Sequence, residues 1–498
     1  MKLIGALDQG TSSTRFIIFN HDGQIVAMDQ MEHQQILLND GWVEHNALEI
    51  WDNSKKVIEG ALKKVGITGS DLAAIGITNQ RETVLAWNKK TGLPLANAIV
   101  WQDIRGKNNL EKLSESQKIS VQHLSGLPAA PYFSASKMQW LLENAPSVKA
   151  AEDDDSLIFG TMDTWLLWNL TGGANSGVFA TDVTNASRTL LMDIEKLEWN
   201  DELLEIFDIK KSTLPSIKSS SEIYGHTLKD GVFGSEIPIS GILGDQQAAM
   251  VGQGCFVKGD SKCTYGTGNF ALVNTGTQIV RSENGLLTTV CYKFGSESTR
   301  YALEGSVAVT GAAVQWLRDQ LELIQSADEI EDLAKSVPDN GGVYFVPAFS
   351  GLFAPHWRSD ARGAIVGLTR GVTKAHLARA ALEAICYQSR EVLVALAIES
   401  GVQLKQLRVD GGITNNDLCM QLQADILQTE IVRPQIIETT ALGAAYAAGL
   451  SVGYWKSTDE LKTKSVIANK WSPVKDSELA TKGFEQWEKA VSKTLDWI

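Results

Sequence analysis

Residues Asp8–Arg15, with the sequence DQGTSSTR, lie between two apolar runs, Leu3–Leu7 and Phe16–Phe19. Short apolar runs joined by small polar residues predict two strands and a tight turn, and a third run at Ile25–Met28 extends them to an antiparallel meander. The small side chains of the turn leave its backbone N–H groups open, and concave rows of such groups hold phosphate oxygens. The segment is therefore either a phosphate-binding loop or simply a hairpin turn.

The pattern of strand, small-residue turn and strand recurs in the second half of the chain at Lys262–Val273, where the turn is Gly266-Thr267-Gly268. Two similar halves, each mixing strands and helices, predict an α/β fold with two domains, residues 1–250 and 251–498. In the second half a helix is expected over Ala312–Leu323. Because ligand clefts are common between domains, the two turns are placed to grip a triphosphate from both sides.

The composition is that of an ordinary globular protein, with 498 residues, of which 44% are hydrophobic and 21% charged. The net charge of −14 disfavours a nucleic-acid-binding protein, because such domains are usually basic. No apolar run approaches the roughly 20 residues that span a bilayer, so no membrane insertion is expected. The five cysteines include no CxxC pair, which argues against a disulfide framework or a structural zinc site and predicts a cytoplasmic location.

Two familiar nucleotide-binding motifs are excluded. The chain contains no GxxxxGK[ST] sequence, so a P-loop is absent. Residues Gly266–Ala271 fit the relaxed dinucleotide pattern GxGxxA, but that pattern requires a helix after the glycines. The residues that follow predict a strand and a turn, which argues against an NAD site.

Asp8 closes the first apolar strand directly before the first turn. A carboxylate beside a phosphate loop is well placed to bind Mg²⁺, directly or through water, because this ion prefers oxygen ligands. The alternative is an Asx turn in which Asp8 caps its own backbone. Arg15 leaves the same turn, where its charge would neutralise phosphate.

Charged residues at predicted strand ends are candidates for contacts with a substrate. Arg81 and Glu82 follow a predicted buried strand, where they either bind vicinal hydroxyl groups or belong to a surface ion pair or a turn. Asp245 lies between the apolar strand Ile237–Leu243 and a run of small residues, so it is either a helix N-cap or a general base. Trp101 follows another predicted strand in the same half of the chain.

Longer motifs connect these segments. Tyr132–Asn144, with the sequence YFSASKMQWLLEN, and the segment Gly363–Glu383 resemble the two signatures of the FGGY carbohydrate kinases. Together with Asp8–Arg15, they extend the resemblance over nearly the whole chain. Within that family, Asn79–Thr83 and Gly244–Gln247 resemble the branch that acts on glycerol.

The resemblance implies an α/β fold of two duplicated actin/hexokinase/Hsp70-like, or ribonuclease H-like, domains around a central cleft. It implies ATP-dependent phosphorylation of glycerol to sn-glycerol 3-phosphate, with ATP as co-substrate, Mg²⁺ as the metal and Asp245 as the general base. The family's positions for ATP fall on Thr11, Ser12, Ser13, Arg15, Thr267, Gly311, Gln315, Gly412 and Asn416. Its positions for glycerol fall on Arg81, Glu82, Tyr132, Asp245 and Gln246, with Trp101 and Phe270 as an apolar wall. Its metal-linked carboxylate falls on Asp8, and a homodimer or homotetramer is expected.

Two other functions fit parts of the pattern. Another FGGY kinase, acting on a pentulose or on gluconate, would share the fold and both loops. An actin-like or Hsp70-like ATPase would share them too, but it would not explain Arg81 and Glu82 together with Asp245. The resemblance therefore favours glycerol as the acceptor.

Some relatives are regulated through the segment that precedes Gly244, by fructose 1,6-bisphosphate or by phosphorylation of a histidine. Here that segment has one lysine, Lys229, and the position of the phosphorylated histidine falls on Gly231. A bisphosphate site favours several cationic or N–H donors. Neither control is therefore predicted, and His226 is expected to be an unmodified loop residue.

Overall fold

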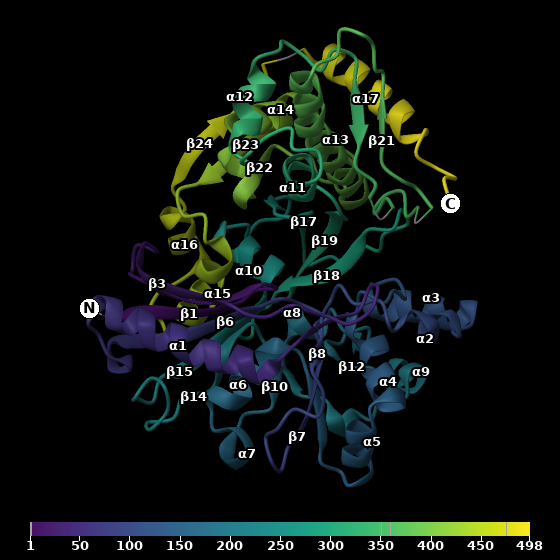
Figure 1. Cartoon of the computed structure of the whole chain (residues 1–498). Coiled ribbons are helices and arrows are strands. Elements are labelled where there is room, and N and C mark those ends of the chain that lie inside the picture. The colour runs from purple at the N-terminus through teal and green to yellow at the C-terminus, as the bar shows by residue number, and fades with distance from the viewer. Residues whose placement is uncertain (1, 350, 359, 475) are drawn as a thin grey trace.

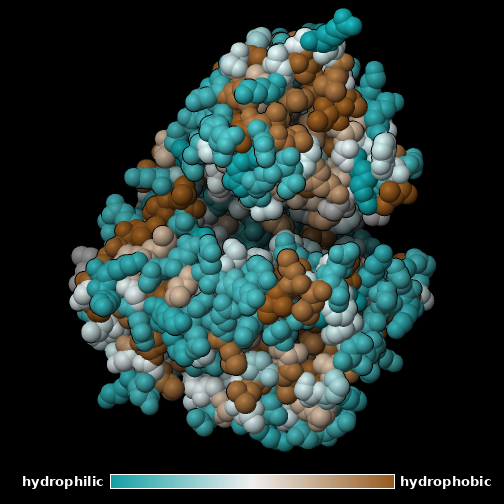
Figure 2. Space-filling model, viewed as in Figure 1, coloured by the Kyte–Doolittle hydropathy of each residue, from teal (hydrophilic) through white to brown (hydrophobic). Residues whose placement is uncertain are grey.

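The computed structural model describes residues 2–349, 351–358, 360–474 and 476–498. It has two lobes, and the space-filling view shows a hollow between them (Figures 1 and 2). Each lobe is built on one large sheet.

The sheet of the first half has the strand order β14-β15-β6-β1-β2-β3. Its strands are β1 Leu3–Gln9, β2 Ser13–Phe19, β3 Ile25–Glu32, β6 Leu72–Asn79, β14 Ser221–His226 and β15 Pro238–Gly244. The first three strands pair antiparallel in sequence order, which confirms the predicted meander. β6 and β15 then add in parallel, so the carboxyl ends of β1, β6 and β15 meet at one edge.

The sheet of the second half has the strand order β18-β19-β17-β16-β22-β23-β24. Its strands are β16 Ser261–Tyr265, β17 Asn269–Gly276, β18 Leu287–Tyr292, β19 Arg300–Val307, β22 Gln406–Asp410, β23 Glu430–Pro434 and β24 Ile467–Trp471. β16 pairs antiparallel with β17, and β17 with β19, while β22 and β23 add in parallel on the other side of β16. This repeats the pattern of the first sheet and confirms the predicted duplication.

Two helices join the halves. They are α10 (Asp245–Gly252) from the first half and α15 (Thr439–Ser451) from the second. The two pack closely on each other, and α15 also covers β1, β6 and β15 of the first sheet (Figure 1). A Cβ atom added at Gly443 would lie 1.8 Å from the Ala248 carbonyl oxygen, so this approach requires glycine. The domain boundary at residue 250 stays a prediction. Although α15 belongs to the second half of the sequence, it packs on the sheet of the first half.

The helix after β19 is shorter than expected. α11 spans Gly311–Asp319, whereas the predicted helix continued to Leu323. Glu322 has a φ of +51°, in the left-handed region, so the helix cannot continue through it. Leu323 is partly buried through this turn, which explains why its spacing resembled that of a helix.

All five cysteines are buried, and none forms a disulfide. Among the described residues, no helix combines the length and the apolar character that crossing a membrane requires.

Candidate active site

The first small-residue turn connects β1 to β2, and its backbone closes with a hydrogen bond of 2.9 Å from Gly10 N to Ser13 O. Thr11 and Ser12 are partly or fully exposed at its tip, whereas Ser13 is buried as the first residue of β2. Arg15 does not point freely outward, because its Nη1 lies 2.7 Å from Glu438 Oε2, next to α15. The turn is therefore tied to the second half of the chain.

The second turn connects β16 to β17 and closes with a similar backbone hydrogen bond over one residue fewer, with Gly266 N donating to Gly268 O at 3.0 Å. Its carbonyl oxygens hold the start of α11, because Gly311 N donates to Gly266 O at 3.1 Å. A Cβ atom at Gly311 would lie 2.5 Å from that same oxygen, so only glycine fits. Thr267 and Gln315 remain exposed nearby.

A third glycine turn follows β22. Gly411 has a φ of +90° and no room for a Cβ atom, which would lie 2.3 Å from Tyr265 O. A Cβ atom on Gly412, by contrast, would meet no atom within 4 Å, so a ligand has open access to this backbone. Asn416 caps α14 (Asp417–Leu427), with its Oδ1 accepting from Cys419 N at 2.8 Å.

Asp8 lies at the carboxyl end of β1, opposite Arg15 in the strand register. Burial raises the pKa of its carboxyl group to about 7, although the charge of Arg15 opposes this, and the nearby carboxylates of Glu438 and Asp245 raise it further. Two carboxylates and one guanidinium therefore act on the buried carboxyl group of Asp8, which adds a further negative charge when it is ionised. A cation beside it would relieve that charge.

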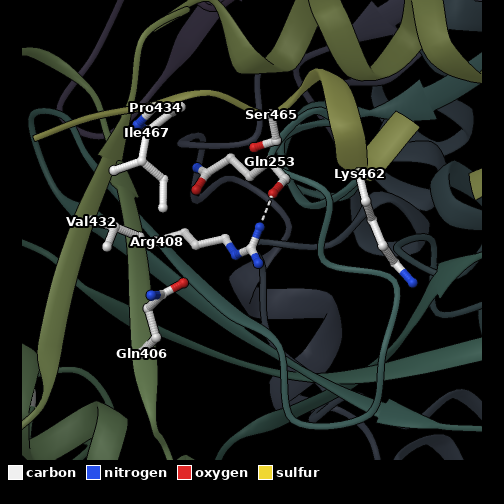
Figure 3. A pocket seen from close by; sticks show the side chains of 8 residues that line it. All are labelled: Gln253, Gln406, Arg408, Val432, Pro434, Lys462, Ser465 and Ile467. Atoms are coloured by element: carbon white, nitrogen blue, oxygen red, sulfur yellow. Dashed lines mark hydrogen bonds between the residues drawn. The ribbon is translucent and has the colours of Figure 1, made fainter. Parts of the chain in front are cut away.

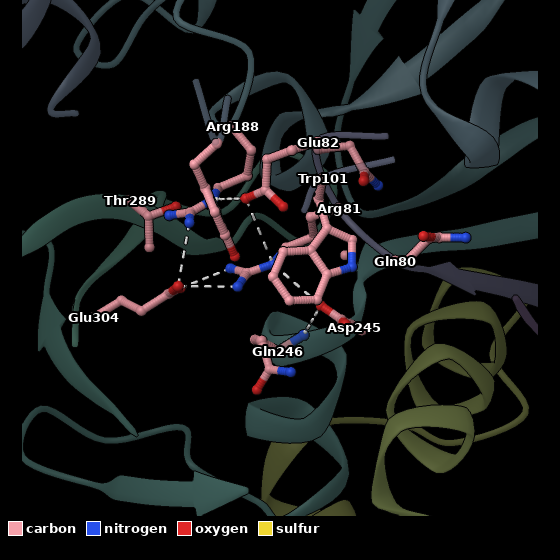
Figure 4. A network of polar contacts seen from close by, with 12 residues as sticks. Gln80, Arg81, Glu82, Trp101, Arg188, Asp245, Gln246, Thr289 and Glu304 are labelled. Carbon is pink, nitrogen blue, oxygen red and sulfur yellow. Dashed lines mark hydrogen bonds and ion pairs between the residues drawn. The ribbon is translucent and has the colours of Figure 1, made fainter. Parts of the chain in front are cut away.

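Arg81 and Glu82 follow β6 and are 3% and 1% exposed, so the alternative of a surface ion pair is wrong. Glu82 has a φ of +62°, an uncommon conformation for a residue other than glycine. Arg81 Nε lies 3.1 Å from Oδ1 of Asp245, which directly follows β15. The three predicted substrate residues thus meet where β6 and β15 end, and Figure 4 shows their side chains close together.

Asp245 is the first residue of α10, and the N-cap is Gly244, so the capping alternative is also wrong. Its Oδ1 accepts from the backbone N–H of Gln246 at 2.7 Å. The side chain is 30% exposed, in contrast to its buried partner Arg81. A carboxylate that is held at one oxygen and belongs to a partly exposed side chain is suited to accept a proton.

Three aromatic rings close one side of this cluster. The ring of Trp101 packs edge-to-face on Tyr132, with centroids 5.5 Å apart, and on Phe270 at 6.3 Å. Trp101 Nε1 donates to Thr11 Oγ1 at 3.0 Å, which links the wall to the first turn. Phe270 belongs to β17, so both lobes contribute to the wall.

Sequence reasoning missed several buried residues of this site. Glu304 accepts from both terminal nitrogens of Arg81, at 2.6 and 2.9 Å, and Arg188 donates to Glu82 at 2.6 Å. Lys262 donates to the side-chain oxygens of Gln246 and Thr264, and burial lowers its pKa. A charged residue that directly follows apolar residues within a strand, as Glu304 follows Ala302 and Leu303 in β19, is a signal that a buried partner exists.

A separate cavity of 170 Å³ lies in the second half, beside β22 and β23. Arg408 and Gln253 line it, and Arg408 donates to the Gln253 carbonyl oxygen (Figure 3). None of the predicted site residues lines this cavity, so it is distinct from the site between the lobes.

The sequence matches the models of the N-terminal and C-terminal domains of the FGGY family of carbohydrate kinases, over residues 3–252 and 261–452. The chain belongs to this family. The FGGY kinase described here is 58% identical to the glycerol kinase of Mycobacterium tuberculosis, over 99% of this chain and 96% of that protein. It is 57% identical to glycerol kinase 1 of Streptomyces coelicolor, over 99% of both chains.

Solved structures agree with the fold. The crystal structure of Plasmodium falciparum glycerol kinase with ADP has a TM-score of 0.93 to this kinase at 41% identity, and the match covers 99% of this chain and 98% of that one. The predicted two-domain fold is therefore confirmed.

Proposed function

We propose that this kinase transfers the terminal phosphoryl group of ATP to glycerol and releases ADP and sn-glycerol 3-phosphate. The observation that carries the proposal is the meeting of Arg81, Glu82 and Asp245 at the carboxyl ends of β6 and β15. Phosphoryl transfer depends mainly on positioning and charge stabilisation, and this arrangement supplies both. The identity of 57–59% to curated glycerol kinases supports glycerol as the acceptor rather than a pentulose or gluconate.

The charged cluster is suited to a small polyol. Glycerol has few atoms with which to bind, so its site must satisfy each hydroxyl group. Asp245 accepts the proton of the attacking hydroxyl, and Arg81 and Glu82 bind the remaining hydroxyls. The ring of Trp101 covers the carbon chain with Tyr132 and Phe270, and it excludes water that would otherwise hydrolyse ATP. Gln246 belongs to the same site through its contact with Lys262.

We place the phosphates of ATP between the turn at residues 10–13 and the turn at residues 266–268. Thr11, Ser12 and Ser13 form one side, with Arg15 behind them, and Thr267 forms the other. Gly311, Gln315, Gly412 and Asn416 receive the adenosine part. Because Asn416 Oδ1 already caps α14, Asn416 would contact the nucleotide through its amide nitrogen.

Mg²⁺ is the metal we propose beside Asp8. This ion usually keeps several waters and takes one or two carboxylates plus substrate phosphates, and a buried carboxylate next to a phosphate loop fits that requirement. When bound with ATP, the ion neutralises charge on the phosphates. Asp8 would hold it from the carboxyl end of β1.

The test is ADP formation by the purified protein with MgATP and, in turn, glycerol, xylulose, ribulose and gluconate. We expect the highest kcat/KM with glycerol. No glycerol-dependent ADP formation, or a higher kcat/KM with one of the other acceptors, would contradict the proposal. The cytoplasmic location, the homodimer or homotetramer and the absence of both controls stay predictions, and light scattering tests the assembly.

A further inference from the structure

Five buried or half-buried groups form one continuous chain of alternating charge (Figure 4). Glu82 Oε1 accepts from Arg188 Nε at 2.6 Å, and Arg188 Nη2 donates to Glu304 Oε1 at 3.1 Å. Glu304 in turn holds both terminal nitrogens of Arg81, whose Nε faces Asp245 at 3.1 Å. The order of the chain is therefore carboxylate, guanidinium, carboxylate, guanidinium, carboxylate.

Only the two ends and Arg81 belong to the proposed glycerol site. We propose that Glu304 and Arg188 are positioning residues for that site: Glu304 orients Arg81, and Arg188 orients Glu82. The inference rests on the proposed function and adds to it two residues that touch no substrate. The second lobe then contributes a positioning residue to the glycerol site, because Glu304 lies on β19 whereas Arg81 and Glu82 follow β6.

The geometry explains how each residue acts. A guanidinium presents donors in a fixed planar fork, and Glu304 occupies one edge of the Arg81 fork with both oxygens. Gln247 Oε1 accepts a further hydrogen bond from Arg81 Nη1 at 3.2 Å. These contacts fix the plane of the guanidinium, and its Nε edge is thereby directed to Asp245 and the cleft.

Arg188 acts on Glu82 in the same way. Its Nε donates to Oε1 of Glu82, so Oε2 stays available for a hydroxyl group. Its guanidinium carbon lies 5.3 Å from the centre of the Phe133 ring, which packs beneath it. Glu82 sits in an unfavourable backbone conformation, and such conformations persist only where the surroundings over-determine them.

Among the five charged groups, Glu304 is the one whose loss would disturb the charge balance most, because it lies between Arg81 and Arg188. Arg188 and Glu304 are both 0% exposed, so neither charge is compensated by water. Burial opposes ionisation of Glu304, but the charges of Arg188 and Arg81 hold its pKa at about 2. If this carboxylate were removed, two buried guanidinium groups would face each other, and Arg81 would lose its orientation.

The test compares Glu304→Gln, Glu304→Asp and Arg188→Lys with a matched control, Glu383→Gln. Glu383 is also a buried glutamate paired with an arginine, Arg379, at 2.9 Å, but within one helix, α13 (Lys374–Ser400). Steady-state assays would give the KM for glycerol and the KM for ATP separately. Each variant's fold would be checked by its circular dichroism spectrum and melting temperature.

We expect Glu304→Gln to raise the KM for glycerol by about tenfold or more, because the loss of a hydrogen bond to a charged group typically weakens binding by that factor. The KM for ATP should stay within about twofold of the wild-type value. Glu304→Asp keeps the charge but shortens the reach, so it should raise the KM for glycerol less. Arg188→Lys loses the fork that joins Glu82 to Glu304, and it should also raise the KM for glycerol selectively. Glu383→Gln should change the two KM values equally or not at all.

A folded Glu304→Gln protein with the wild-type KM for glycerol would overturn the inference. If Glu304→Gln does not fold, a wild-type KM for glycerol in both Glu304→Asp and Arg188→Lys would overturn it as well. Equal rises in both KM values would mean a merely structural role. Failure of the proposed function is a different result, because the wild-type protein itself would then form no ADP in response to glycerol.

Discussion

Asp245 is the residue on which the proposed chemistry depends most. Its Oδ1 is held by Gln246 N–H and by Arg81, while its side chain stays open to the cleft. Asp245→Asn keeps the shape but removes the base, and loss of a general base typically lowers the rate by about 10²–10⁴-fold. We expect kcat to fall by that amount while nucleotide binding, measured by calorimetry, is retained. A kcat near that of the wild type would exclude Asp245 as the base.

Arg81 should affect the two substrates unequally. Arg81→Ala removes charge-assisted hydrogen bonds at the glycerol side of the cleft. It leaves the two turns proposed to bind phosphate, residues 10–13 and 266–268, intact. The KM for glycerol should therefore rise far more than the KM for ATP. Equal increases of the two values would indicate that Arg81 supports the fold rather than the substrate.

Among single residues, the sequence predicted those substrate-site residues that directly follow an apolar strand. Arg81, Glu82 and Asp245 each follow an apolar strand, and parallel strands bring their carboxyl ends together. Glu304 could not be placed with Arg81, because 223 residues separate them and their contact depends on how the two lobes face each other. The strand order of both sheets had to be known first.

Among the elements, the first turn is supported by a buried polar group centred on His45. His45 Nε2 lies 2.9 Å from Gln35 Oε1, and its Nδ1 lies 3.3 Å from Gln80 Nε2. Gln35 donates to Thr11 O, and Gln80 donates to Gly10 O. A neutral imidazole satisfies both contacts, since Nε2 donates to the carbonyl of Gln35 and Nδ1 accepts from the amide of Gln80.

Acid should therefore destabilise the protein through His45. Burial, and to a lesser extent the nearby His33, lower its pKa to about 3, below the usual 6.5. Below pH 6.5 the imidazole of His45 binds a proton in the unfolded chain but stays neutral in the folded chain. The contribution of His45 to the free energy of unfolding is therefore complete above pH 6.5 and is lost as the pH falls toward 3.

Urea unfolding at pH 7.5 and pH 5.5 measures this effect. The wild type should lose about 1 kcal/mol more than His45→Gln between the two pH values. An equal loss in both proteins would show that His45 does not carry the pH dependence.

The approach of α10 to α15 gives a second prediction at the scale of elements. Gly443→Ala places a methyl group against the Ala248 carbonyl, and overpacking of this kind costs about 1–3 kcal/mol. Gly371→Ala is the control, because its nearest atom lies 3.9 Å away. Differential scanning calorimetry should show a lower Tm for the first variant and little change for the second. A wild-type Tm for Gly443→Ala would mean that the helices separate without cost.

For the whole molecule, the sequence predicted the duplication because both halves begin with the same strand, small-residue turn and strand. It did not predict that α15 returns to cover the first sheet, because small residues such as Gly443 and Ala444 suit many helix contacts. This return places Glu438, directly before α15, against Arg15. The site is consequently built from both lobes, with Phe270 and Glu304 coming from the second.

The proposed transfer of a phosphoryl group to glycerol is tested most directly by identifying the phosphorylated product. The purified protein would be incubated with MgATP and glycerol, and ³¹P NMR would follow ATP, ADP, inorganic phosphate and the phosphate ester together. We expect one glycerol phosphate, substituted at a terminal carbon, to form for each ADP, and we expect Asp245→Asn to form almost none. ADP that accumulates with inorganic phosphate instead of the ester would contradict phosphoryl transfer to glycerol.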